Sequence, residues 1–127
     1  MKDSDPASDR RRPAPGATRL ARTPRPPYYA VATTTELAAG YDERAHLERG
    51  ARLYAEARGL GGFLGLETFF ENGASIAVSY WESLDAIERW RRHPAHRDAK
   101  RLAKASWFGP TITRIMRVEN DYGFDLE

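Results

Sequence analysis

The chain of 127 residues contains no cysteine and only three histidines. Without cysteine it can have no disulfide framework, no thiolate nucleophile and no cysteine-ligated metal site, and this absence fits a reducing cytoplasm, which is the location we expect. The sequence also has no run of 18 apolar residues, so we expect no membrane-spanning helix. At this length the chain has room for one modest domain.

Large apolar side chains are almost absent from residues 1–27, where Pro, Arg, Ser, Asp and Ala dominate. Such a segment cannot bury enough surface to offset its ordering entropy, so we predict a flexible tail over 1–27 and one domain over 28–127. The tail holds seven of the 20 basic residues and three of the 18 acidic ones, which leaves 13 basic against 15 acidic residues in the domain. This slightly acidic balance argues against a nucleic-acid partner.

Hydrophobic periodicity after residue 27 predicts a regular alternation of elements. The expected order is a strand over Tyr28–Thr35, a helix between Tyr41 and Gly59, strands over Gly62–Phe70 and Ser75–Trp81, a helix after Ser83 that is interrupted at Pro94 and continues to Ser106, and a last strand within Thr111–Phe124. Asn72 and Gly73 between the middle strands are typical of a tight hairpin. The order βαββαβ predicts an α+β, ferredoxin-like fold with a four-stranded antiparallel sheet.

The strands carry apolar residues on both faces. The strand Ser75–Trp81 does so, and in the strand before it simple alternation places Phe63 and Phe69 on one face and Leu64, Leu66 and Phe70 on the other. Two helices cover only one face of such a sheet. The uncovered apolar face therefore predicts a homodimer formed through the sheets.

Three segments carry a family resemblance: "GFLGLE", "ASIAVSYWESLDAIERWRRHPAHRDAKRLAKASWF" and "TRIMRVENDYGF". They resemble the antibiotic biosynthesis monooxygenase family, and within it the branch of haem-degrading-monooxygenase-like proteins. The resemblance implies a dimeric α+β barrel with a pocket between the sheet and the helices of each subunit. Members of this family include cofactor-free oxygenases that oxidise anthrone-type phenols, and haem degraders.

The haem-degrading relatives use an asparagine on the first strand, a tryptophan in the second helix and an axial histidine ten residues further on. Trp90 matches the tryptophan, but Lys100 stands at the axial position and residues 28–35 contain no asparagine. An ammonium group has no lone pair for iron, so haem is disfavoured as a cofactor, although His96 leaves haem binding open.

A dedicated metal site is also not expected near these histidines. His93 and His96 are three residues apart, but His93 precedes Pro94 and is best interpreted as a helix cap. The nearby carboxylate, Asp98, lies on a different side of the helix from His96. We therefore expect neither a metal nor another cofactor.

Helical geometry places His96 at the edge of an apolar stripe, on one line with Ala103 and Trp107. One interpretation makes His96 a pocket residue, and the other makes it a boundary residue of a closely packed helix. In the first, the protein is a cofactor-independent monooxygenase that uses molecular oxygen on an aromatic or polyketide-like small molecule. His96 is then the base, because an imidazole titrates near neutral pH.

The remaining candidate site residues surround that base. Trp90 is assigned with His96 to catalysis, and the expected substrate-binding residues are Trp107, Tyr29, Tyr54, Tyr80, Ala99 and Ala103. Tryptophans would form pocket walls, tyrosines would supply hydroxyl groups, and alanines would leave volume. Two alternatives stay open: a non-catalytic small-molecule-binding dimer of the same fold, and a haem-binding or haem-degrading protein.

Overall fold

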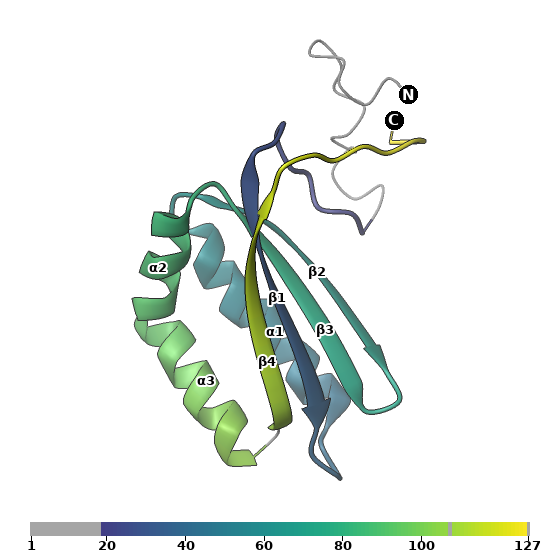
Figure 1. The fold of residues 1–127 in the computed structure, drawn as a ribbon. Coiled ribbons are helices and arrows are strands. Elements are labelled where there is room, and N and C mark those ends of the chain that lie inside the picture. Colours follow the sequence, from purple (N-terminus) through teal and green to yellow (C-terminus); the bar gives the residue numbers. More distant parts are fainter. Residues whose placement is uncertain (1–18, 107, 127) are drawn as a thin grey trace.

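The computed structural model describes residues 19–106 and 108–126. Its elements are β1 (Tyr28–Leu37), α1 (Glu43–Arg58), β2 (Phe63–Glu71), β3 (Ala74–Trp81), α2 (Leu84–Arg92), α3 (Pro94–Ser106) and β4 (Phe108–Val118). The four strands form one antiparallel sheet in the order β2-β3-β1-β4, and the helices lie on one side of it (Figure 1). The predicted ferredoxin-like α+β fold is confirmed.

Local sequence signals fix several of these elements. The hairpin between β2 and β3 turns at Asn72 and Gly73, which both have positive φ (49° and 79°) as a tight two-residue hairpin requires. Ser83 caps α2, because its side chain accepts a hydrogen bond of 3.1 Å from the amide of Ala86. The second helix is interrupted at Pro94, which begins α3 as expected.

The core lies where β3 meets α1 and α2. Its buried members are Ala57, Trp81, Ala86, Ile87 and Trp90, with partly buried side chains of β1, β2 and α1 packed around them. Alternation along the strands sends one set of side chains into this core and the other set to the face that bears no helix.

The predicted face of Phe63 is wrong. Leu64 is an extra residue in β2, because Phe63 pairs with Trp81 while Gly65 pairs with the adjacent Tyr80. This β-bulge turns Phe63 toward the core, where its ring meets that of Trp81 edge-on at 5.1 Å. Phe69 stays on the open face with 57% of its surface exposed.

The described part of the N-terminal segment contacts that open face. The amide of Ala21 donates a hydrogen bond of 2.8 Å to the Glu67 carboxylate on β2. Gly65 lies beneath it, and a Cβ on Gly65 would come within 2.8 Å of the Ala21 Cβ. Residues from about 19 to 27 therefore run along one end of the sheet, while the boundary at residue 27 stays a prediction. No helix in the described part of the chain is long and apolar enough to cross a membrane.

Candidate functional site

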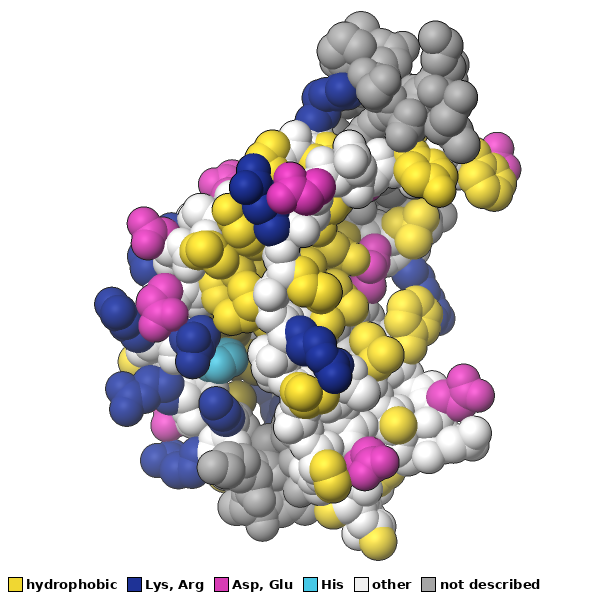
Figure 2. Space-filling model, viewed as in Figure 1, with side chains coloured by type: hydrophobic (Ala, Val, Ile, Leu, Met, Phe, Trp, Pro, Cys, Tyr) yellow, Lys and Arg dark blue, Asp and Glu magenta, His cyan; other side chains and the backbone are white. Residues whose placement is uncertain are grey.

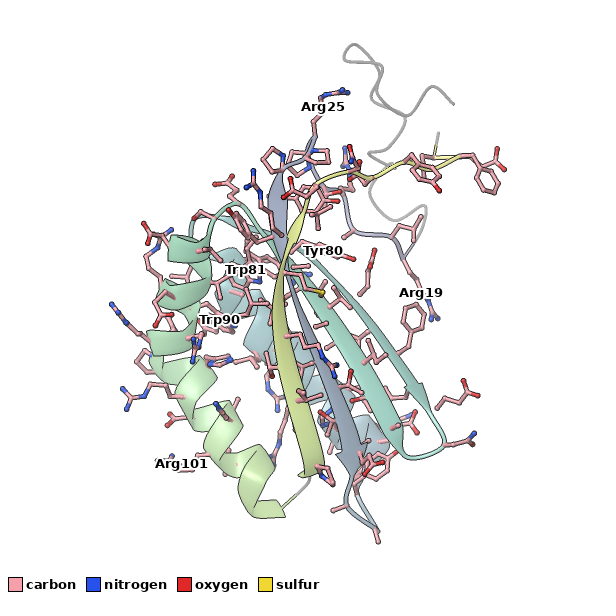
Figure 3. The ribbon with its side chains drawn as sticks, viewed as in Figure 1. Arg19, Arg25, Tyr80, Trp81, Trp90 and Arg101 are labelled. Atoms are coloured by element: carbon pink, nitrogen blue, oxygen red, sulfur yellow. The ribbon has the colours of Figure 1, made fainter. Side chains whose placement is uncertain are left out.

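Trp90 occupies the space between the sheet and the helices. It is only 4% exposed, and its ring centroid lies 6.2 Å from those of Tyr54 and Trp81, 5.5 Å from His93 and 5.2 Å from His96. Figure 3 shows Trp81 extending from the sheet and Trp90 from α2 on the same side of the sheet. The rings therefore fill the region in which the family resemblance implies a pocket.

A buried polar group lies beneath these rings. The indole nitrogen of Trp81 donates a hydrogen bond of 2.9 Å to Ser79 Oγ. Burial raises the pKa of Tyr54, so its phenol stays protonated at neutral pH. Ser79 was not predicted as a site residue. A hydroxyl group on the otherwise apolar, helix-facing side of β3 is the feature of the sequence that could have indicated it.

The two histidines beside Trp90 differ in role, as the position of Pro94 predicts. His93 closes α2 and its Nδ1 accepts a hydrogen bond of 3.1 Å from the amide of Ala95, so it caps the start of α3. His96 is half-buried, and its ring centroid lies 5.2 Å from that of Trp90. Burial, and then the positive charge of Lys100, lower the pKa of His96. At neutral pH one of its ring nitrogens therefore keeps its lone pair and can accept a proton.

His96 opens onto a cleft of about 630 Å³ that is lined from α2 and α3. The lining residues are Glu88, Arg91, Arg92, His96, Arg97, Lys100 and Arg101. Figure 2 shows lysine and arginine side chains gathered over these helices around a histidine, whereas hydrophobic side chains gather over the upper part of the strands. This cleft differs in place from the pocket expected between sheet and helices, because the rings of Tyr54, Trp81 and Trp90 take up that space.

The structure brings some predicted site residues together and separates others. Tyr29 and Tyr54 pack against the cluster that holds Trp90, and Ala99 is half-buried on α3 one turn after His96. Tyr80 lies on the opposite face of the sheet, where its hydroxyl donates a hydrogen bond of 2.6 Å to Glu67. Burial and then this acceptor raise the pKa of Tyr80. Trp107 and the side chain of Ala103 lie outside the described part of the structure.

The described residues around the cleft offer few groups that could ligate a metal ion or haem iron. Within 19–106 and 108–126 no group of three or more His, Asp or Glu side chains could hold a metal ion. Lys100, at the position of the relatives' axial ligand, lines the cleft beside Arg97 and Arg101 and offers only donors.

Comparison with known proteins places the chain in a family. No protein-family model matches it. The chain is 39% identical over 104 residues to YqjZ, an uncharacterized protein of Bacillus subtilis, in a match that spans 79% of this chain and 87% of YqjZ. The chain belongs to the YqjZ family.

Solved structures share the fold of this YqjZ-family protein. SnoaB of Streptomyces nogalater, described as a cofactor-independent oxygenase, superimposes with a TM-score of 0.65 at 12% identity over 76% of this chain and 97% of SnoaB. A candidate antibiotic biosynthesis monooxygenase of Nitrosomonas europaea also gives 0.65, at 7% identity, over 76% of this chain and 94% of its own. The resemblance to the antibiotic biosynthesis monooxygenases is thus confirmed at the level of fold.

Proposed function

We propose that the protein is a cofactor-independent monooxygenase that oxidises an electron-rich aromatic small molecule in the cleft beside His96. The proposal depends chiefly on the position of His96, whose ring lies 5.2 Å from that of Trp90 and lines the cleft, and whose lowered pKa favours the neutral imidazole. A neutral imidazole at this pH is suited to general base catalysis. SnoaB, with the same fold, is described as a cofactor-independent oxygenase, and this supports the proposal.

The proposed reaction needs no electrons beyond those of the substrate and dioxygen. His96 removes a proton from an acidic methylene or phenol, and the cations of Lys100 and Arg97 beside it stabilise the resulting anion. The anion reacts with dioxygen at carbon. For an anthrone-type methylene, loss of water from the hydroperoxide gives the ketone, so one oxygen atom enters the product and the other leaves as water.

The protein also acts as a homodimer in this proposal. Phe69, Ile76, Ile112 and Met116 lie on the sheet face that carries no helix, and each has more than two fifths of its surface exposed. Exposed apolar side chains gathered on one face are typical of an interface, and two identical faces can pack on each other. Light scattering at micromolar concentration should give twice the monomer mass of 14.4 kDa.

Oxygen uptake tests the oxygenase proposal. Chelator-treated protein is mixed with dithranol, a dihydroxyanthrone, in an oxygen electrode, and the rate is compared with that of a heat-denatured sample. We expect uptake clearly above the denatured control, with one oxygen consumed for each ketone formed. Equal rates in the two samples would contradict the oxygenase proposal for this substrate class.

The close packing around Trp90 favours a second candidate, a non-catalytic small-molecule-binding dimer. A ring that is 4% exposed leaves no room for a substrate on its core side. Saturable binding of dithranol without oxygen uptake would favour this candidate over the oxygenase. If added hemin keeps the absorbance spectrum of free hemin, the candidate is also favoured over a haem protein.

A further inference from the structure

The cleft between α2 and α3 concentrates positive charge that the proposed proton transfer alone does not require. Five of its seven lining residues are Arg or Lys, and the single lining carboxylate is Glu88. The domain as a whole is slightly acidic, so this excess is local. Figure 2 shows it as a cluster of dark blue side chains over α2 and α3.

Acidic partners neutralise only part of this cluster. Glu88 lies 3.4 Å from Arg91 and 3.7 Å from Arg92, and Asp98 lies 3.1 Å from Arg101. For Arg97 and Lys100 no carboxylate of the described residues lies within ion-pair distance. These two side chains come from successive turns of one helix, so both cations can reach the same ligand.

The bend at Pro94 brings the cations of two helices into one concave surface. α2 ends at Arg92, His93 caps the junction, and α3 presents Arg97, Lys100 and Arg101 on the turns that follow. Like charges at this spacing destabilise a helix, and a bound anion relieves that repulsion.

We propose that the cleft binds the oxyanion group of a small organic acid, a carboxylate or a phosphate, through Arg97 and Lys100. Arginine and lysine are the usual partners of such groups, and arginine can contact two oxygens at once. This proposal rests on the proposed function, because it takes the bound anion to be part of the oxygenase substrate. The substrate is then an aromatic compound with an anionic group beside its reactive hydroxyl or methylene.

Spacing along α3 supports this arrangement. His96 and Lys100 are one helical turn apart, about 6 Å along the axis. Hydrogen bonds of about 2.8 Å from each side chain let both reach one small aromatic acid, whose neighbouring hydroxyl and anionic groups are closer together than about 6 Å. The anion would contact Lys100 and Arg97 while an adjacent hydroxyl meets the accepting nitrogen of His96. A neutral phenol would have only the second contact.

Binding titrations of the full chain at low ionic strength test the proposal. The probes are inorganic phosphate, 2-hydroxybenzoate and phenol, each followed by tryptophan fluorescence and by amide shifts in NMR spectra. The cleft variant is Arg97→Gln with Lys100→Gln. The matched control is Arg44→Gln with Arg52→Gln on α1, two exposed residues whose replacement changes the net charge by the same amount.

We expect 2-hydroxybenzoate to bind more tightly than phenol and to lose roughly tenfold in affinity in the cleft variant, with less than a twofold change in the control. Added salt should weaken binding because these cations are largely exposed. If phosphate competes with 2-hydroxybenzoate, the cleft binds oxyanions in general. If 2-hydroxybenzoate binds and phosphate does not, the carboxylate is the group that the cleft binds.

Three results would overturn the proposal: binding of neither anion, equal weakening in the two double variants, or cleft-dependent binding of duplex DNA or anionic vesicles without binding of small anions. Failure of the oxygenase proposal is distinguishable, because the anions would then bind in the cleft while oxygen uptake stays at the control rate both with dithranol and with an anthrone that carries a carboxylate.

Discussion

Replacement of Trp90 by alanine separates a structural role of this ring from a purely catalytic one. Trp90 is 4% exposed and contacts Tyr54, Trp81, His93 and His96. Removal of a buried aromatic ring costs about 3–5 kcal/mol, as lost transfer free energy plus the cavity that remains. That is a large part of the roughly 5–15 kcal/mol by which a domain of this size is stable.

Urea denaturation followed by far-ultraviolet circular dichroism measures this cost without relying on tryptophan fluorescence. Leu84→Ala is the matched control, because Leu84 lies on the same helix α2 but is 54% exposed. We expect the control to change the unfolding free energy by no more than about 0.5 kcal/mol. A Trp90→Ala protein as stable as Leu84→Ala would refute the assignment of Trp90 to the core.

Further predictions concern the backbone, the histidines and the open face. Gly62 has φ +96° and a Cβ there would lie 2.5 Å from Ala86 Cβ, so Gly62→Ala should lower the unfolding free energy by about 2–5 kcal/mol in the same urea assay. Burial lowers the pKa of His46 and His96 below 6.5, so the unfolded chain takes up protons first as the pH falls. The contribution of these two histidines to the unfolding free energy should therefore be fully present above pH 6.5. It should decline as the pH falls from there toward the lower pKa values of the folded state, and the decline should be shallower in His96→Gln. Identical pH curves for the two proteins would contradict this. Phe69→Glu should give a monomer in light scattering, whereas Glu71→Gln on the same strand should leave the mass unchanged.

Local chemistry in the sequence was sufficient to predict most of the fold. The turn at Asn72–Gly73, the cap at Ser83 and the interruption at Pro94 each depend on a few adjacent residues, and all three are confirmed. The end of the last strand was less well placed. β4 runs over Phe108–Val118 and includes Pro110, which an edge strand tolerates because one side of its backbone bonds no neighbour.

Features that depend on contacts between distant segments could not be predicted. The bulge at Leu64 lies where residue 21 crosses the sheet at Gly65, and alternation along β2 alone gives the wrong face for Phe63. The position of the cleft could not be predicted either, because it depends on how completely the rings packed around Trp90 fill the space between the sheet and α2. The separation of Tyr80 from His96 follows from strand register, which the hairpin turn and its bulge set together.

The proposed function requires that His96 acts as the base of a cofactor-free oxidation. Its most direct test is kcat/KM for dithranol oxidation by His96→Gln compared with His93→Gln, since both variants remove one imidazole from the surroundings of Trp90. We predict a loss on the order of 100-fold or more for His96→Gln, the usual contribution of a general base, and a much smaller change for the capping residue. Equal activity of the wild-type and His96→Gln proteins would contradict the claim.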